Sequence, residues 1–305
     1  MALFDINDKG KLTLIKEADF KLEREIQKLI EDNLKLVFGF EYVRSEFGIN
    51  NFRIDTLGFD KDQKSFVIIE YKRDKNFSVI DQGYAYLSLM LNNKADFILE
   101  YNENCLDTLK RDDVDWSQSK VIFISPSFTS YQREAINFKD LPIELWEIKR
   151  FNNYTVNIIK IQTAGAKESV KTISRQDETI ETVSREIKVY TEQEHLDVAT
   201  DETKELYEKV KLSILNLDNL EVKPKKKYVA FVASSNVVDI HIQRNGLKLW
   251  LNLSKNTLDD PKNIARDVSE IGHWGNGDYE ISLKTDEDIE YIMSLIKQSL
   301  KRNKK

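Results

Sequence analysis

The sequence predicts a two-domain α/β protein, in which a mixed central sheet flanked by helices is followed by a smaller α+β domain. Helical and strand-like segments alternate over residues 1–162, a polar stretch follows, and further strands and helices occupy 201–305. Alternating helices and strands are typical of a sheet with helices on both faces. At 305 residues the chain is long enough for two separate cores.

The first domain is expected to begin with a long helix over 18–38, whose apolar residues recur at helical intervals. Residues 66–69 are apolar on both faces, which is typical of a central, buried strand. A second helix is expected over 79–91. Further strands are expected at 96–100, 120–125, 143–148 and 154–159, and a short helix at 131–138.

The stretch 163–200 has few large apolar residues and no sustained periodicity, so we expect a polar linker there. The domain over 201–305 is expected to start with a helix and to end with another at 286–300. Strands between them are expected at 228–232, 237–242, 247–253 and 279–283, with a hairpin turn at Asn245-Gly246.

Two short segments of the first domain carry charged residues that suit a metal and phosphate site. Asp55 lies fifteen residues before Glu70, and Lys72 follows two residues after Glu70. One hairpin would bring the two carboxylates together, and alternation along a strand puts Glu70 and Lys72 on one face. Two carboxylates and an ammonium form a site for a hard divalent cation and a phosphate. Alternatively, these charges mark only where the strand reaches solvent.

The flanking helices carry polar residues at matching intervals. Glu23 and Gln27 share one side of the first helix, and Gln82 and Tyr86 share one face of the second. The chain order is therefore a helix with an acid, a strand, a strand with Asp55, a strand with Glu-x-Lys, and a helix with Gln-xxx-Tyr. Glu25 is an alternative to Glu23 as the helix acid.

With these four motifs in order, residues 20–101 resemble the PD-(D/E)XK nuclease superfamily, in particular its RecB-like branch with the archaeal mismatch and single-strand endonucleases. The resemblance implies a restriction-endonuclease-like core. It also implies a Mg²⁺ or Mn²⁺ site made by Asp55, Glu70 and the carbonyl of Tyr71, with Glu23 nearby. In this sequence Asp55 precedes threonine rather than following proline.

The residues then take roles in phosphodiester hydrolysis. Lys72 would orient or help deprotonate the attacking water, and Gln82 and Tyr86 would hold the site by hydrogen bonds. Arg53, Arg73 and Lys75 flank the site and are candidate phosphate contacts, although solvated surface positions would look the same in sequence.

Composition excludes several classes of protein. The hydrophobic content of 41% and charged content of 32% are those of an ordinary soluble protein. The single Cys105 excludes an internal disulfide framework and a cysteine zinc site. The absence of a membrane-length apolar run predicts a cytoplasmic protein that does not enter a membrane. A net charge of −6 argues against a strongly basic nucleic-acid binder but not against a nuclease.

The last hundred residues resemble an uncharacterised domain of bacterial proteins labelled predicted transport proteins, on the KKYVAF, LKLWLNL and GHWGNGDYEI segments and Asp260-Pro261. No chemistry follows from that resemblance. His241 and His273 lack partners at metal-ligand spacing. Trp250 and Trp274 would stack on a base or belong to the core, and the lysines at 225–227 would contact phosphate or solvent.

The sequence thus predicts a Mg²⁺-dependent nuclease acting on nucleic acid, with DNA as the first candidate and repair or defence as its process. Whether the chain forms a homodimer stays open. One alternative is a nucleic-acid-binding module that has lost catalysis. Another is a protein associated with transport or assembly.

Overall fold

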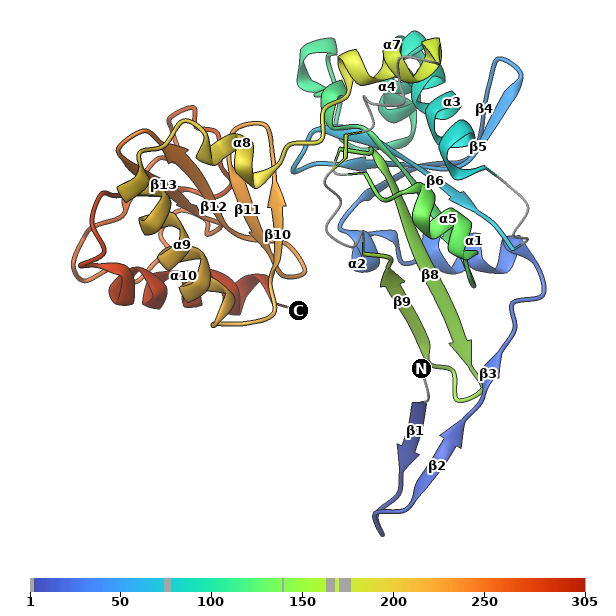
Figure 1. The fold of residues 1–305 in the computed structure, drawn as a ribbon, viewed down its shortest axis with the longest axis horizontal. Coiled ribbons are helices and arrows are strands. Elements are labelled where there is room, and N and C mark those ends of the chain that lie inside the picture. Colours follow the sequence, from blue (N-terminus) through green and yellow to red (C-terminus); the bar gives the residue numbers. More distant parts are fainter. Residues whose placement is uncertain (1–2, 74–77, 139, 163–167, 170–176, 305) are drawn as a thin grey trace. The chain divides into compact units, whose positions relative to one another are not determined.

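The computed structural model describes residues 3–73, 78–138, 140–162, 168–169 and 177–304. The chain divides into two compact units, Met1–Val189 and Tyr190–Lys305. Unit 1 is a mixed sheet with helices on both faces, and unit 2 is an antiparallel sheet with helices (Figure 1). The predicted fold class is therefore confirmed.

The central sheet of unit 1 has the strand order β3-β8-β7-β6-β5-β4, and β9 also pairs with β8. Strands β6, β7 and β8 run parallel to one another, whereas β4, β5 and β9 are antiparallel to their neighbours. The strands are β3 (Glu17–Ala18), β4 (Glu41–Ile49), β5 (Phe52–Asp60), β6 (Ser65–Tyr71), β7 (Lys120–Ser125), β8 (Ile143–Phe151) and β9 (Val156–Lys160).

Strand β6 lies at the centre of this sheet, and all seven of its residues are buried. Its side chains alternate between two apolar clusters, with Phe66 and Ile68 in one and Val67 and Ile69 in the other. A strand covered on both faces reads as a continuous apolar run, which is why the sequence revealed this one.

Helices cover the two faces of this sheet unequally. Helices α1 and α2 pack on the face that holds Val67 and Ile69, whereas α3 packs on the opposite face together with α4, α5 and α7. The helices are α1 (Glu23–Glu31), α2 (Leu34–Phe38), α3 (Val79–Asn92), α4 (Lys94–Asn104), α5 (Ser130–Ala135) and α7 (Glu178–Glu186), with 3₁₀ turns η1 (Arg111–Asp113) and η2 (Trp116–Gln118).

Three sequence expectations for unit 1 were wrong in part. The segment 96–100 is helical, within α4, because Phe97 and Tyr101 fall one turn apart and are both buried, while Leu99 is 56% exposed. The helix expected over 18–38 begins only at Glu23 and divides into α1 and α2.

The third difference concerns the polar linker expected over 163–200. Among its described residues, 178–186 form helix α7, which the Asp177 side chain caps by accepting from two backbone N–H groups. Ile180, Val183 and Ile187 are buried in the core of unit 1. Three apolar residues spaced three and four apart suffice to dock a short helix, although the surrounding composition is polar.

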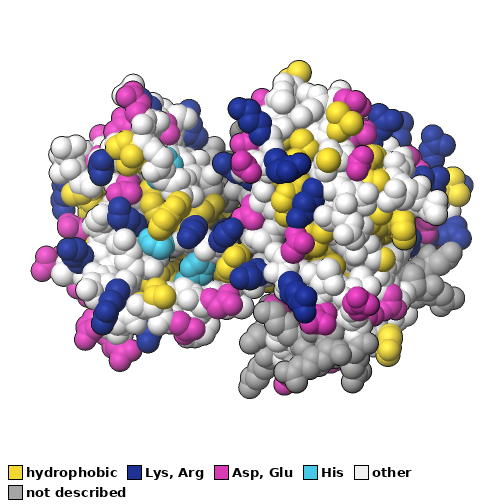
Figure 2. All heavy atoms as spheres, turned by 90° about the horizontal axis from the view of Figure 1, so that it is seen from above, with side chains coloured by type: hydrophobic (Ala, Val, Ile, Leu, Met, Phe, Trp, Pro, Cys, Tyr) yellow, Lys and Arg dark blue, Asp and Glu magenta, His cyan; other side chains and the backbone are white. Residues whose placement is uncertain are grey.

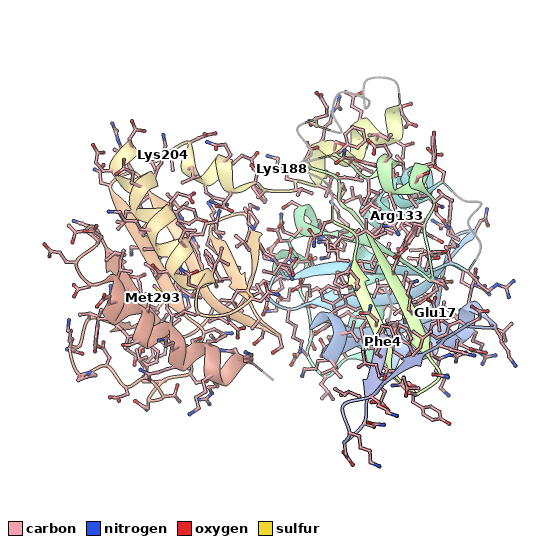
Figure 3. All side chains as sticks on the ribbon, turned by 60° about the horizontal axis from the view of Figure 1, so that its bottom comes forward. Phe4, Glu17, Arg133, Lys188, Lys204 and Met293 are labelled. Atoms are coloured by element: carbon pink, nitrogen blue, oxygen red, sulfur yellow. The ribbon has the colours of Figure 1, made fainter. Side chains whose placement is uncertain are left out.

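A separate hairpin precedes the sheet, formed by β1 (Leu3–Ile6) and β2 (Leu12–Ile15) (Figures 1 and 3). The cross-strand pairs Phe4–Leu14 and Ile6–Leu12 put four apolar side chains on one face, each about half exposed or more. A two-stranded hairpin with so much exposed apolar surface is marginally stable by itself.

Unit 2 is built on a six-stranded antiparallel sheet of order β10-β11-β12-β13-β15-β14. Helices α9 and α10 bury one face of it, with Val238 and Ile240 of β12 in the shared core. The elements are α8 (Glu192–Leu196), α9 (Asp201–Leu215), β10 (Glu221–Pro224), β11 (Val229–Val232), β12 (Asn236–Gln243), β13 (Gly246–Leu251), β14 (Arg266–Asp267), β15 (Tyr279–Leu283) and α10 (Ile289–Asn303).

Helix α8 suggests where unit 2 starts, so we predict that a fragment of residues 190–305 folds by itself. Leu196 packs against the core of unit 2, and the ring of His195 hydrogen-bonds the carbonyl oxygen of Lys225 at 2.6 Å. A fragment of residues 201–305 lacks both contacts and should be less stable by about 1–3 kcal/mol. Urea unfolding followed by circular dichroism measures the difference, and equal midpoints would contradict the role given to α8.

Candidate functional site

The candidate site lies where two neighbouring strands separate. Strands β5 and β6 pair from Asp60–Ser65 as far as Thr56–Ile69. Beyond this point β5 stays paired with β4 through Phe52, while the backbone N–H of Lys72 still bonds β7 at Ile124. The sheet therefore opens into a fork between β5 and β6, and Asp55 and Glu70 are the first residues beyond the last pair.

Side chains replace the backbone partners that β5 loses at this fork. The backbone carbonyl of Asp55 accepts from Nε2 of Gln27 at 3.0 Å, and the carbonyl of Arg53 accepts from the hydroxyl of Tyr86 at 3.3 Å. Carbonyls two residues apart on a strand point to the same edge, which here is the edge that β6 has left. Gln27 comes from α1 and Tyr86 from α3, so helices on both faces hold the fork open.

Glu70 is the most enclosed charged group of the site, with 4% of its surface exposed. Its Oε1 accepts from Nζ of Lys72 at 2.7 Å and from Nε2 of Gln82 at 3.2 Å. Its Oε2 is buried without a hydrogen-bond partner in the described part of the chain. An unpaired buried carboxylate oxygen is costly, so a positive or donating group beside Oε2 would be favourable.

Asp55 occupies the other side of the fork and is half-buried. Its Oδ2 accepts from the backbone N–H of Tyr71 at 3.0 Å, which joins β5 to β6 through a side chain. Burial, and after it the charge of Glu70, raises the pKa of Asp55 to about 7, while the Tyr71 N–H and Lys72 act in the opposite direction. Two carboxylates that oppose each other's ionisation would be relieved by a cation.

Gln82 and Tyr86 are one turn apart on α3, where the sequence placed them on one face. Nε2 of Gln82 lies 3.4 Å from the Tyr86 hydroxyl as well as near Glu70. Burial, followed by the charge of Glu70, raises the pKa of Tyr86 above its usual range. Tyr86 therefore stays protonated and acts as a hydrogen-bond donor.

The structure separates the two candidate acids of α1. Oε1 of Glu23 accepts from the backbone N–H of Arg73 at 2.7 Å, directly after Lys72. Glu25 instead bonds the guanidinium of Arg150 at 3.3 Å. Glu23 is thus the acid beside the end of β6, although its contact is with backbone rather than with Asp55 or Glu70.

The three basic residues expected near the site differ in their surroundings. Arg53 forms an exposed ion pair with Glu46 at 2.8 Å. Arg73 donates to the carbonyl of Lys21 at 2.6 Å and lines an open hollow of about 510 Å³. Lys75 lies outside the described residues.

Sequence reasoning placed Gln27 beside Glu23 but gave it no role, and it missed Glu46. Besides Asp55, the Gln27 amide lies 3.1 Å from Oε1 of Glu46, whose charge also contributes to raising the pKa of Asp55. Gln27 shares the Glu23 face of α1, which was the available signal. Glu46 is on β4, at a positive φ of 53° within a strand, and nothing in the spacing of the motifs marks it.

The donor set suits a hard cation with few protein ligands. Oε2 of Glu70 has no partner among the described residues, a bound cation would favour the ionised form of Asp55, and the candidate ligand atoms of both side chains are oxygens. The described residues contain no group of three or more His, Cys, Asp or Glu side chains arranged to hold a metal. Mg²⁺ commonly binds through one or two carboxylates, with water and substrate phosphate completing its shell. Asp55 and Glu70 fit that pattern.

The fold and site define a mixed α/β unit with a carboxylate pair and a lysine at a strand fork, joined to a second α+β unit. The chain is 53% identical over 294 residues to an "Uncharacterized protein" of Haemophilus influenzae, which covers 96% of this chain and 97% of that protein. It belongs to the family of that protein. A model described as "Domain of unknown function (DUF5655)" matches residues 192–302, so the C-terminal match carries no transport label.

Two solved structures are partly similar to this chain. A repair endonuclease from Pyrococcus abyssi is 21% identical, with a TM-score of 0.25 over 43% of this chain and 49% of that one. An EndoMS–dsDNA complex is 19% identical, with a TM-score of 0.27 over 45% of this chain and 51% of that one. The chain thus spans about half the length of either structure.

In the described parts of the chain, no helix combines the length and apolar character needed to cross a membrane. The cytoplasmic location stays a prediction.

The raised pKa of Asp55 predicts how stability depends on pH in the absence of metal. An unfolded Asp has a pKa of about 3.9, so between about pH 4 and 7 the folded state binds more protons than the unfolded state. The free energy of unfolding should therefore fall as pH rises through this window. Asp55→Asn should remove the effect, and the variant should exceed wild type by on the order of 2 kcal/mol at pH 8.

Urea unfolding in EDTA at pH 4 and pH 8 tests this prediction. The two proteins should be similarly stable at pH 4, and the variant of the exposed Asp8 (Asp8→Asn) should follow wild type at both pH values. Equal destabilisation by Asp55→Asn at both pH values would show that the carboxylate is needed for folding rather than held for a ligand.

Proposed function

We propose that unit 1 is a metal-dependent nuclease that hydrolyses phosphodiester bonds of nucleic acid. The observation that carries this proposal is the buried Glu70, whose Oε2 has no partner among the described residues, while Lys72 and the half-buried Asp55 lie at the same fork. Carboxylates arranged only to stabilise a fold have their oxygens paired.

Asp55 and Glu70 would hold a Mg²⁺ or Mn²⁺ ion, with the backbone carbonyl of Tyr71 as a third protein ligand. Such an ion supplies Lewis-acid polarisation of the phosphate and lowers the pKa of a bound water. Both side chains belong to strands fixed on their outer sides by β4 and β7, so the ligands are held before the ion binds.

Lys72 would act on the substrate and the attacking water. Its side chain is 21% exposed, and its ammonium lies 2.7 Å from Oε1 of Glu70. There it can orient the water by a hydrogen bond and stabilise the negative charge that develops on the phosphate. The water oxygen bonds to phosphorus, the bond to one ester oxygen breaks, and that oxygen leaves with a proton.

Gln82 and Tyr86 would position the carboxylates rather than touch the substrate. Gln82 occupies Oε1 of Glu70 together with Lys72, which leaves Oε2 for the cation. Tyr86 holds the β5 backbone at Arg53, two residues before Asp55. Glu23 would support the end of β6 through the Arg73 backbone.

The substrate would be nucleic acid, with DNA as the first candidate, because exposed basic residues such as Arg53 can contact the phosphate backbone. DNA repair and defence against foreign DNA are processes that such an activity would serve. A binding module without catalysis would use the same fork to hold nucleic acid without cleaving it.

We expect wild-type protein to cut at least one member of a panel of labelled single- and double-stranded DNA and RNA in Mg²⁺ or Mn²⁺, and nothing in EDTA. Asp55→Asn and Lys72→Ala should each lower cleavage by at least about 100-fold, because they remove a cation ligand and the nearby positive charge. Binding, which rests mostly on phosphate contacts, should change far less.

Lys120→Ala is the matched control for Lys72→Ala. Lys120 also pairs with a glutamate of this sheet, Glu144, at 3.0 Å, but sits at the start of β7, whereas Lys72 follows the end of β6. It should cut like wild type. If wild-type protein binds the panel but cuts none of it, the binding-module function replaces the nuclease.

Tyr86→Phe tests whether the fork must be held open for catalysis. The variant keeps the ring but loses the donor to the Arg53 carbonyl, so Asp55 should be less well placed. We expect a loss of about 10- to 100-fold in activity or in apparent metal affinity, as for other groups that orient metal ligands. A metal titration of the cleavage rate measures it, and an unchanged curve would remove Tyr86 from the site.

A further inference from the structure

The face of the unit 2 sheet that α9 and α10 do not cover carries an unusual set of side chains. The core residues Val238 and Ile240 face the helices, so Asp239 and His241 between them face the other way. The register pairs Asp239 with Trp250 and His241 with Lys248 on β13, so aromatic and basic groups lie side by side on this second face.

The loop 272–278 folds across part of this face and is tightly fitted to it. A Cβ at Gly275 would lie 2.5 Å from the Trp250 ring, and one at Gly277, where φ is +85°, would lie 1.9 Å from the carbonyl oxygen of Leu251. Asn276 bonds the buried carboxylate of Asp239 through its backbone N–H at 2.6 Å. Only glycine fits these two positions, because the loop backbone lies so close to β13.

This closely packed loop presents Trp274 to solvent. Trp274 is 54% exposed, whereas most tryptophan side chains are largely buried. The ring of His241 meets it edge-on, with centroids 4.7 Å apart, and Nζ of Lys227 lies 5.0 Å from its centroid. Trp274 is thus fixed from two sides yet left open, as a stacking platform is.

Hydrogen-bonding ring nitrogens of three residues belong to this face and its loop. Nδ1 of His241 donates to the carbonyl of Lys227 at 2.6 Å, since a carbonyl can only accept, and burial lowers the pKa of this histidine. Nε2 of the neutral ring is then an acceptor. Nε1 of Trp250, a residue only 2% exposed, and Nδ1 of His273 are buried without partners in the described part of the chain.

Basic groups lie near the platform, together with acidic groups that have partners. After burial, the charges of His195, Lys227 and Lys248 lower the pKa of His241, while Lys248 is paired with Glu280 at 3.0 Å and the Asp239 carboxylate with Asn276. Lys226 and Lys227 are exposed, and the buried Lys225 precedes them. Histidine side chains lie among hydrophobic and basic ones on unit 2 (Figure 2). All three histidines of the chain belong to unit 2, and two of them contact these tryptophan rings.

We propose that this face of unit 2 binds single-stranded nucleic acid, with one base stacked on Trp274 and the adjoining phosphate near Lys227. A fixed, exposed aromatic ring beside basic side chains on an open sheet face suits an unpaired base, because every base has a π-face. Duplex bases are already stacked on each other and cannot use the ring. DNA and RNA strands share this chemistry.

Binding of the full chain to fluorescein-labelled dT15, rU15 and a 15-base-pair duplex, measured by anisotropy in EDTA, tests the proposal. Trp274→Ala should weaken binding of dT15, rU15 or both by about tenfold or more, because one stacked base is lost, whereas Trp274→Phe should keep most of the affinity. Duplex binding should change less than twofold. Thermal melting checks that the variants are folded.

Lys227→Ala and Lys262→Ala form a matched pair of charge controls. Both lysines lie over an aromatic ring of unit 2, Lys262 at 4.5 Å from the ring centroid of Tyr291 on α10. Only Lys227→Ala should weaken single-strand binding. Wild-type protein that binds neither strand, Trp274→Ala binding both as wild type does, equal losses for the two lysines, or an equal loss on duplex would each overturn the proposal.

The outcome is separate from that of the nuclease assay. Single-strand binding that depends on Trp274 in a protein that cuts nothing would support this inference and refute the nuclease. Cleavage of nucleic acid, together with single-strand binding that Trp274→Ala does not change, would support the nuclease and refute this inference.

Discussion

The separation of β5 from β6 is the constraint on which the candidate site depends. A sheet interior has no room for two carboxylates and a lysine, because every backbone group there is paired and every side chain packed. The backbone pairing of β5 with β6 ends at Thr56–Ile69. Asp55 and Glu70 come directly after this pair, where the two strands separate. The fork is stable because Gln27, Tyr86 and the Asp55 side chain satisfy the backbone groups that lose their partners.

The electrostatics of the fork follow from the same geometry. Glu70 is deep in the sheet and is partly neutralised by Lys72, whereas Asp55 is opposed by both Glu70 and Glu46. Burial, and after it the charge of Glu70, raises the pKa of Asp55. Such an arrangement favours a ligand of positive charge, which is the physical link between this site and the proposed nuclease chemistry.

Unit 2 is built on a separate, antiparallel sheet whose two faces are covered differently. Helices α9 and α10 bury one face, and the other face is covered only in part, by a loop with two glycines that no other residue could replace. The pairing of Asp239 with Asn276 anchors this loop and leaves Trp274 in solvent. A protein that cuts or holds nucleic acid with unit 1 would gain a second point of attachment here.

The sequence by itself determined the elements whose apolar pattern is clear, namely the continuous run of β6 and the helical periods of α3 and α10. It also determined the same-face placement of Glu70 with Lys72 and of Gln82 with Tyr86. Local geometry sets these relations, because strands repeat every two residues and helices every 3.6. Tertiary structure decided the rest. The segment 96–100 looks strand-like in sequence but is helical, because burial of Phe97 and Tyr101 requires helical spacing. Part of the polar stretch is ordered because helix α7 packs on the core of unit 1. Contacts between residues distant in sequence decide which of Glu23 and Glu25 lies beside the end of β6. Such contacts also bring Gln27 and Glu46 close to Asp55, and no local periodicity encodes them.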